Sequence, residues 1–572
     1  MKCRFNIGLL YLILLFNASV FGQVELNQFG FYNKSPKKAA VIANPDVKDF
    51  TIVTETGKEV YKGNLSEPMQ SKNSSLVVCQ ADFTKFTKSG KYRLIAGNQE
   101  SGVFTIGDRV LNDVAKGVLK GFYYQRASEP LEVKYAGRWA RPEGHPDTLV
   151  EIHSSAATPQ RPEGTVIRSP GGWYDAGDYN KYIVNSGITT ATLLSAYEDF
   201  PAYFQKLTVN IPETGNGVPD ILNEALYNIR WMLTMQDPND GGVYHKCTNA
   251  VFDGMIMPDA AKEPRYVVQK STAAALDFTA VMAQASRVFA QFPKELPCLA
   301  DSCLLAAKQA WVWALQHPDI LYNQFTMNEQ FQPAIITGDY GDNKVDDEWF
   351  WAATEMYATT SDSAYKNKAK EYPDGEWEVP KWNLVYMLGV YTMLRIKEPE
   401  FTPGFTEKLL GMADKLVNSI QTNAFGVVMG QDRWDFIWGS NSVAANQGIL
   451  LIQAYRLTQD IKYLNAALAN TDYLLGRNAT GYCFVSGFGT KGVIHPHHRP
   501  TIADGIDAPV PGLMSGGPNL GMQDQCKYPF TDPERAYMDI SESYASNEIA
   551  INWNAPAVYL FNAIEAEQVM WK

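Results

Sequence analysis

Cysteine is scarce in this sequence, with seven residues in 572. Six of them follow an N-terminal apolar run, and Cys298 with Cys303 is the most local candidate pair for a disulfide. So few cysteines in so long a chain exclude a disulfide-stapled scaffold, and buried free thiols are the expected state. The absence of CxxC and HExxH spacings also excludes the common zinc motifs.

Positively charged residues are also few: the chain has 50 Lys and Arg against 62 Asp and Glu, which gives a net charge of −12. That balance argues against nucleic acid and anionic membrane surfaces as partners. The apolar run Ile7–Phe16 is too short to span a bilayer, and no later stretch is long enough. Its positive start and the small residues after it predict a signal peptide over residues 1–22. We therefore expect an exported monomer, periplasmic or secreted, without a membrane anchor.

The sequence is rich in apolar and aromatic residues, which make up 45% and 12% of the chain. This composition is typical of a globular protein and excludes disorder along the whole chain. Its 13 Trp and 30 Tyr supply flat rings of the kind that stack on the C–H faces of sugars, although most will pack in a core. An acidic, aromatic-rich protein fits an uncharged ligand.

Two regions differ in their patterns. Residues 23–107 contain short β-type runs separated by turn residues, which predicts an immunoglobulin-like β-sandwich. The runs are Lys38–Ala43, Phe50–Thr54, Glu59–Tyr61, Ser75–Cys79, Lys91–Ala96 and Val103–Ile106.

Residues 108–572 have apolar residues at three- and four-residue intervals, which predicts about twelve helices. Six antiparallel helix pairs closed into a ring make an (α/α)6 barrel, and this count fits one. Three segments between the helices, Arg138–Gly177, Asp237–Val267 and Gly476–Ser541, are predicted as long loops. They are rich in Gly, Pro and aromatic residues, and long ordered loops usually carry function. The predicted helices are Val110–Gln125, Ser186–Asp199, Pro219–Met235, Lys270–Gln291, Ala300–Gln316, Asp346–Ala358, Ser361–Tyr372, Lys381–Ile396, Phe405–Gln421, Asn441–Leu457, Ile461–Leu475 and Ser546–Gln568.

Three motifs hold chemically useful side chains. Asp175 and Asp178 lie three residues apart in a Gly-rich, aromatic-flanked loop, where catalysis and calcium binding are both open interpretations. Glu548 precedes the last helix, where an acidic residue often only complements the helix dipole. The third motif, His495-Pro-His-His-Arg499, has a permanent cation in it, which favours hydrogen bonding to hydroxyls or carboxylates over metal binding.

Together these motifs resemble glycoside hydrolase family nine, the endoglucanase family. The Asp-Ala-Gly-Asp loop, the His-x-Arg element and the terminal pattern aromatic-x-Asp-x4-aromatic-x3-Glu-x-Ala-x3-Asn-Ala occur in the family's order. The terminal pattern is matched by Tyr537, Asp539, Tyr544, Glu548, Ala550, Asn554 and Ala555. The β-rich region resembles the immunoglobulin-like module of one branch, so the resemblance covers nearly the whole mature chain.

The resemblance implies an inverting hydrolase of β-1,4-glucans, with Asp178 as general base, Asp175 as the partner that helps to hold the water, and Glu548 as general acid. Inversion needs the acid and the base on opposite faces of the sugar, with room for one water. A substrate-binding set is also implied: His497, Arg499, Trp438, His245, Asp539 and Tyr544.

No cofactor is required for this chemistry. Asp347 and Glu348, at a predicted helix start, resemble the family's calcium-binding element. An equal alternative is that these acidic residues only cap the helix. Zinc is not expected, because Ala127 stands where related members carry a zinc-ligating Cys.

The predicted substrate is a plant-type β-glucan: cellulose, mixed-linkage glucan or xyloglucan, cut internally. Two alternatives stay open. One is a chain-end-cutting cellodextrinase, if the Arg138–Gly177 segment blocks one end of the cleft. The other is a non-catalytic glycan-binding protein on the same barrel, which would have no need of a carboxylate acid–base pair.

Overall fold

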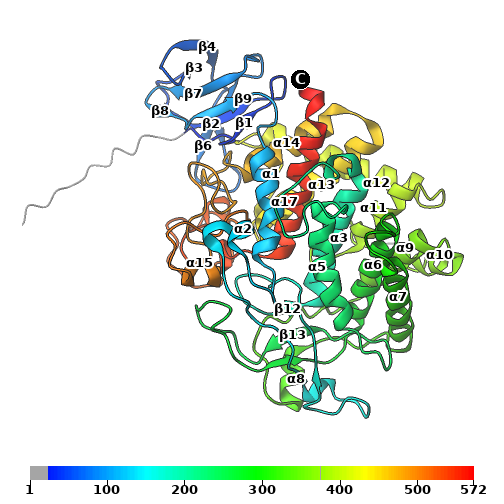
Figure 1. Ribbon diagram of the computed structural model, residues 1–572. Coiled ribbons are helices and arrows are strands. Elements are labelled where there is room, and N and C mark those ends of the chain that lie inside the picture. Colours follow the sequence, from blue (N-terminus) through cyan, green and yellow to red (C-terminus); the bar gives the residue numbers. More distant parts are fainter. Residues whose placement is uncertain (1–23, 374) are drawn as a thin grey trace, which may run out of the picture.

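The computed structural model describes residues 24–373 and 375–572. A small β domain lies against one corner of a larger helical domain, and the C-terminus ends near the boundary between them (Figure 1). The predicted signal peptide lies outside the described residues. Strand β9 ends at Ile106 and helix α1 begins at Asn112, so the change of structure falls close to the predicted boundary at residue 107.

The β domain consists of two sheets packed around an apolar core. One sheet has the order β1-β9-β7-β3-β4 with β8 paired to β7, and the other has the order β2-β6-β5. Alternate residues of β7, including Tyr92 and Leu94, point inward against Phe83 and Ile52, as strand alternation requires. All six predicted β runs form strands. The strands are β1 (Gly30–Phe31), β2 (Lys38–Ile42), β3 (Asp49–Thr54), β4 (Glu59–Asn64), β5 (Met69–Gln70), β6 (Val77–Asp82), β7 (Gly90–Ala96), β8 (Gln99–Glu100) and β9 (Phe104–Ile106).

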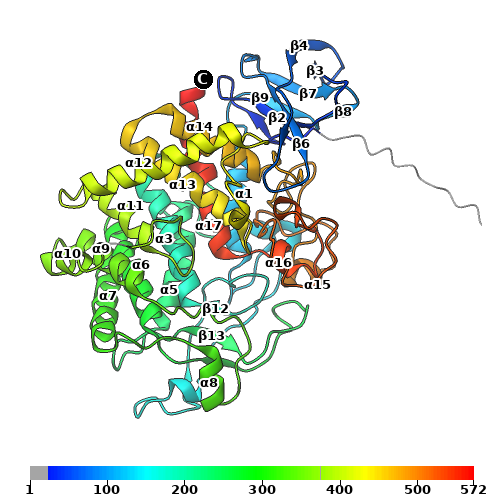
Figure 2. The ribbon, with the colours of Figure 1, turned by 180° about the vertical axis from the view of Figure 1, so that it is seen from behind.

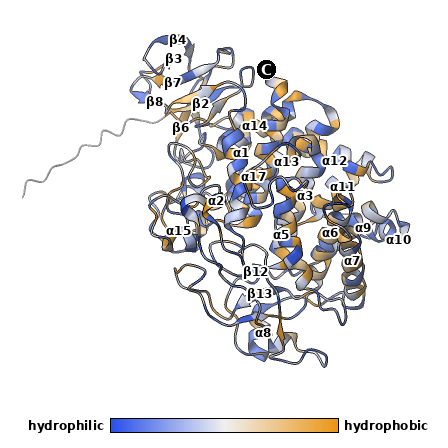
Figure 3. Cartoon of the chain, in the orientation of Figure 1, coloured by the Kyte–Doolittle hydropathy of each residue, from blue (hydrophilic) through white to orange (hydrophobic). Residues whose placement is uncertain are grey.

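The helical domain contains all twelve predicted helices as an inner and an outer ring. Most residues of the inner helices are buried, whereas the outer helix α12 buries only one stripe. The outer helix α1 accordingly carries both apolar and polar residues along its length (Figure 3). The inner helices are α3 (Ile183–Asp199), α6 (Thr272–Phe289), α9 (Asp346–Thr360), α11 (Tyr386–Ile396), α13 (Ser440–Thr458) and α17 (Ile551–Glu567). The outer helices are α1 (Asn112–Tyr124), α5 (Asp220–Thr234), α7 (Leu299–Gln316), α10 (Ser363–Ala369), α12 (Thr402–Ser419) and α14 (Ile461–Leu474).

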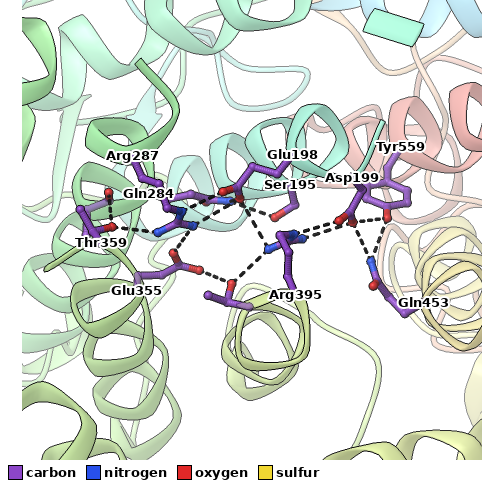
Figure 4. A network of polar contacts seen from close by, with 12 residues as sticks. Ser195, Glu198, Asp199, Gln284, Arg287, Glu355, Thr359, Arg395, Gln453 and Tyr559 are labelled. Carbon is purple, nitrogen blue, oxygen red and sulfur yellow. Dashed lines mark hydrogen bonds and ion pairs between the residues drawn. The ribbon is translucent and has the colours of Figure 1, made fainter. Parts of the chain in front are cut away.

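A buried polar network joins all six inner helices (Figure 4). Arg395 Nε donates to Asp199 Oδ1 at 2.8 Å, and Asp199 Oδ2 accepts from Gln453 Nε2 at 2.8 Å. Arg287 bonds Glu198 and Glu355, each at 2.8 Å. Five of the six helices contribute from their C-terminal halves. The members, in ring order, are Asp199, Arg287, Glu355, Arg395, Gln453 and Tyr559.

Two of the three segments predicted as loops form a small sheet together with Lys181–Tyr182. Its order is β11-β10-β14-β13-β12, and β12 begins three residues after Asp178. The loop prediction was wrong here because strands of two to four residues are too short to show alternation in the sequence. The strands are β10 (Val150–Ile152), β11 (Val166–Ile167), β12 (Lys181–Tyr182), β13 (Lys246–Asn249) and β14 (Arg265–Val267).

The β domain is fastened to the barrel by buried polar and aromatic contacts. Asn27 Nδ2 donates to Asp472 Oδ1 at 2.8 Å, and Tyr32 Oη donates to Glu565 Oε1 at 2.6 Å. The Tyr32 ring also stacks on Trp571 with centroids 5.2 Å apart. The β domain is therefore built against the barrel as part of one structure.

Two further observations concern the described residues. The six cysteines from Cys79 to Cys526 are all free, so Cys298 and Cys303 form no disulfide. Within residues 24–373 and 375–572, no helix combines the length and apolar character needed to cross a membrane.

Candidate active site

A cleft of about 710 Å³ lies where the segments preceding the inner helices meet. Residues that precede five of the six inner helices, α6 excepted, line the cleft. Seven of the predicted site residues line it: Asp175, Asp178, Trp438, His497, Arg499, Tyr544 and Glu548. The segments of α15 (Arg499–Ala503) and α16 (Tyr544–Asn547), far apart in the sequence, lie side by side below the β domain (Figure 2).

Asp178 presents one carboxylate oxygen to the cleft. Its Oδ2 accepts from Asn180 Nδ2 at 2.6 Å and from Tyr182 Oη at 3.3 Å. Its Oδ1 has no hydrogen-bond partner among the described residues. The side chain is only 6% exposed, so that free oxygen faces a confined space. This is the arrangement that a base needs to bind and deprotonate a water.

Asp175 is held more tightly. Its Oδ1 accepts from Asn185 Nδ2 at 2.7 Å, and its Oδ2 accepts from Tyr340 Oη at 2.6 Å. Burial, and then the charge of Asp178, raise the pKa of Asp175 well above its ordinary value. Because both oxygens are engaged and the side chain is buried, Asp175 supports the loop from behind, and Asp178 is the carboxylate open to a ligand.

Glu548 reaches the cleft from the turn between α16 and α17, where it is partly buried. Burial first, and then the charges of Asp178 and Asp175, raise the pKa of Glu548 well above its ordinary value, while Arg499 opposes the shift. Desolvation and neighbouring carboxylates both favour the protonated form of the acid. A carboxylic acid that keeps its proton near neutral pH can act as a general acid.

Arg499 lines the cleft and also bonds backbone carbonyls beside it. Its Nη1 donates to the carbonyl of Gly177 at 2.8 Å, and its Nε donates to the carbonyl of Asp253 at 3.0 Å. No ion pair joins Arg499 to Asp178 in the described structure. Arg499 therefore braces the backbone just before the base, and does not neutralise its carboxylate directly.

His497, Tyr544 and Trp438 line the cleft, and Asp539 supports them from outside it. His497 Nδ1 bonds the carbonyl of Ser541 at 2.6 Å, which leaves Nε2 for another partner. Asp539 accepts from two backbone amides of the loop that carries His497, each at 2.9 Å, as expected of a supporting residue. The rings of Trp438 and Tyr544 lie 5.6 Å apart, and Trp438 is 40% exposed, as a stacking platform requires.

His245 does not line the cleft in this structure. The side chain is fully buried and its ring stacks on Tyr322. Nδ1 bonds Ser271 Oγ at 2.9 Å and Nε2 bonds the carbonyl of Asp339 at 2.8 Å, so neither nitrogen is available to a sugar. As placed here, His245 supports the cleft wall from behind, because Asp339 itself lines the cleft.

The predicted metal residues lie at the start of α9, outside the cleft. Asp347 Oδ2 accepts from the Val385 amide at 2.7 Å. Both Glu348 oxygens are buried without a hydrogen-bond partner, as are both oxygens of Asp277 and one of Asp342. Among residues 24–373 and 375–572, no group of three or more His, Cys, Asp or Glu is arranged to hold a metal.

The position where the resemblance suggests a zinc-ligating Cys is occupied by Ala127, which packs in a small buried cluster with Tyr174, Tyr179 and Ala261. The Ala127 side chain cannot ligate a metal. The imidazole of His145 lies against Tyr174 and Tyr179, but structural zinc needs four ligands, so these residues do not fit zinc.

Several residues of the site, in the cleft or directly behind it, were not predicted from the sequence. Asn180 and Tyr182 lie within four residues of Asp178, and their polar side chains next to a candidate base were a usable signal. Tyr340, Asn185 and the cleft-lining Trp382, Trp553 and Phe252 come from separate segments, and no short motif connects them to the base.

Comparison with known proteins agrees with this geometry. The model of glycosyl hydrolase family 9 matches residues 112–561, and that of the cellulase N-terminal ig-like domain matches residues 20–101. The chain is 45% identical to the xyloglucan-specific endo-β-1,4-glucanase BoGH9A of Bacteroides ovatus, over 95% of this chain and 94% of that one. It is 33% identical to endoglucanase D of Acetivibrio thermocellus, over 94% and 82% of the two chains.

Solved structures are similar over almost the full length. The Bacteroides ovatus GH9 structure has a TM-score of 0.91 and 44% identity, covering 95% of this chain and 99% of that one. A thermostable endoglucanase from Alicyclobacillus acidocaldarius has a TM-score of 0.85 and 32% identity, with the same coverage. The two-domain architecture of a β domain followed by an (α/α)6 barrel is shared with these proteins.

Proposed function

The chain belongs to glycosyl hydrolase family 9, and we propose that it hydrolyses β-1,4-glucans by inversion with Asp178 as base and Glu548 as acid. One observation carries this assignment. A single cleft contains a carboxylate with a free oxygen, Asp178, and a carboxyl group with a raised pKa, Glu548. Two carboxyl groups in such different environments are suited to opposite proton transfers.

The reaction follows from these two states. A water bound at Asp178 Oδ1 attacks the anomeric carbon and gives one proton to that carboxylate. Glu548 donates its proton to the glycosidic oxygen as the carbon–oxygen bond breaks, and the attack from the opposite face inverts the anomeric centre. Exchange with solvent then removes the proton from Asp178 and returns one to Glu548. Asp175 acts behind Asp178, because Tyr340 and Asn185 already occupy its oxygens.

We propose xyloglucan as the preferred substrate and internal bonds as the point of attack. The relative of 45% identity is a xyloglucan-specific endoglucanase, and the cleft rim has exposed Phe252 and Trp438 for stacking on a neutral chain. Of the Arg138–Gly177 segment, only Asp175 and Ala176 line the cleft, which argues against that segment closing one end.

The test is a panel of xyloglucan, carboxymethylcellulose, mixed-linkage glucan and cellotetraose, with product anomers followed by NMR. We expect α-anomers first, long early products, and the highest kcat/KM on xyloglucan. β-Anomers first would contradict inversion. Short products from the start would contradict internal cutting, and absence of reducing-sugar release would favour a glycan-binding protein.

We also propose that calcium binds beside α9, although the chemistry requires no cofactor. The orphaned oxygens of Asp277, Asp342 and Glu348 lie close to Asp347, and burial with mutual repulsion raises the pKa of Glu348 and of Asp277. Hard oxygen donors of this kind suit Ca²⁺, once small side-chain rotations bring them to bonding distance. Metal analysis of protein purified without chelator, and the Tm with EDTA or excess calcium, test this. No bound calcium and an unchanged Tm would contradict it.

A further inference from the structure

The nearest side-chain donor to the proposed base is the amide of Asn180. Its Nδ2 donates to Asp178 Oδ2 at 2.6 Å, and its backbone amide lies 3.3 Å from the same oxygen. The Asn180 side chain is fully buried, so it contacts neither the cleft nor solvent. Its effect on catalysis must therefore act through Asp178.

The orientation of the Asn180 amide is fixed from its other end. Oδ1 accepts from the Asn249 backbone amide at 2.9 Å, from Arg265 Nη1 at 3.1 Å and from Thr248 Oγ1 at 3.1 Å. A flipped amide would place its NH₂ against a backbone N–H and a guanidinium, which can only donate. The NH₂ group must therefore face Asp178.

Arg265 is itself held by the small sheet. Its Nε and Nη2 bond the two oxygens of Asp147 at 3.0 and 3.3 Å, and Lys181 Nζ contacts the same carboxylate at 2.6 Å. Arg265 comes from β14 and Lys181 from β12. Since all three side chains are buried, the positive end of this network is rigid and points at Asn180.

We infer that Asn180 is the positioning residue of the base: clamped by Arg265, it fixes Asp178 Oδ2 and turns Oδ1 toward the water. This inference rests on the proposed role of Asp178 as base. It gives the segments once predicted as loops a function, because their strands build the clamp.

Other ionisable groups also face Asp178. Asp175 and Glu548 are carboxyl groups, and Lys246 is a buried cation on β13, where burial lowers its pKa to about 7. The facing groups are Asp175, Tyr182, Lys246, Asp253, Tyr340, His497 and Glu548.

The experiment compares Asn180→Ala and Asn180→Asp with the full-length wild type on a soluble glucan. For Asn180→Ala we expect kcat to fall about 10- to 100-fold with KM within about twofold, since a misplaced base costs turnover more than binding. The acid limb of the kcat/KM profile should move to higher pH. Asn180→Asp keeps the shape of the side chain but places a carboxylate against Asp178. The acid limb of its kcat/KM profile should therefore move to still higher pH than that of Asn180→Ala.

The order of the two variants separates positioning from packing. If Asn180 only filled space, the shape-preserving Asp variant would be the milder one, and that order would overturn the inference. An unchanged pH profile, or failure of both variants to fold, would also overturn the inference. Asn562→Ala is the matched control: it is an equally buried Asn with both amide ends bonded, on the distal part of α17, and should leave the profile unchanged.

Asp178→Asn distinguishes this inference from the proposed function. A nearly inactive Asp178→Asn beside a fully active Asn180→Ala would reject the inference alone. An active Asp178→Asn would reject the assignment of the base itself.

Discussion

The backbone amide of Ile551 donates a hydrogen bond of 2.9 Å to the backbone carbonyl of Asp175. Asp178 lies three residues after that carbonyl, and Glu548 lies three residues before that amide. The bond therefore joins the segment of the proposed base to the segment of the proposed acid without engaging either carboxyl group. Inversion requires a gap for one water between the two carboxyl groups. A bond between the two backbones holds their segments together more rigidly than a bond between flexible side chains would.

Asp178→Asn and Glu548→Gln should each lower kcat on xyloglucan or cellulosic substrate by about 10²- to 10⁴-fold, the range typical of a lost general base or acid. Both variants keep their shape, so thermal unfolding should be close to wild type. An aryl cellobioside with a dinitrophenolate leaving group needs little protonation, so it should restore much of the rate to Glu548→Gln and none to Asp178→Asn. Equal rates for the two variants on that substrate would remove the distinction between acid and base.

Asp175→Asn should make stability less sensitive to pH. The folded-state pKa of Asp175 is raised above its ordinary 3.8, so the folded protein binds more protons than the unfolded chain between those two values. Stability is therefore lost as pH rises through that window, and Asn, which cannot ionise, avoids the loss. Asn at this position can still accept from Asn185 and donate to Tyr340.

We expect the free energy of unfolding of Asp175→Asn, relative to wild type, to be higher at pH 8 than at pH 4 by about 1–3 kcal/mol. Denaturant unfolding at both pH values measures this difference. A difference that stays constant across the window would show that Asp175 titrates normally.

Arg395→Met should destabilise the barrel by about 3 kcal/mol, the lower end of the cost of breaking a buried ion pair, because Arg456 also contacts Asp199. Arg395 joins α11 to α3 through Asp199, which in turn accepts from Tyr559 of α17. Lys370→Met removes an exposed pair with Glu400 and should cost less than about 1 kcal/mol. Urea unfolding measures the loss in free energy of unfolding for each variant. Equal losses in the two variants would show that the network does not stabilise the barrel.

Removal of residues 24–107 should lower the Tm and promote aggregation, because it uncovers Asp472, Glu565 and Trp571 on the barrel. A graded version is Tyr32→Phe, which removes the donor to Glu565 and should cost about 1–2 kcal/mol. Tyr92→Phe is its control, because Tyr92 donates only to Ser89 within the β domain. A truncated barrel as stable as the full chain would reject a structural role for the β domain.

Much of the fold was predictable because its signals are local. Apolar spacing of 3.6 residues defines the long helices, and the start of α9 at Asp346 and of α14 at Ile461 agree with the sequence prediction. Strands of two to four residues, such as β10 and β14, leave no such period. Their pairing depends on contacts between segments far apart in the chain, so sequence analysis assigned them to loops.

The sequence by itself determined the two domains, the helix count and the candidate acidic pair, since each is recorded in periodicity or in a short motif. Only the tertiary structure decided which groups surround those acids. It placed Arg499 on the carbonyl of Gly177, His245 behind the cleft wall, and Asn180 against Asp178. The physical reason is that the proton affinity and the orientation of a carboxyl group depend on burial and on donors a few ångströms away. Some of the groups that fix those donors or act as donors themselves, such as Asn249 on Asn180 and Tyr340 on Asp175, are far away in the chain.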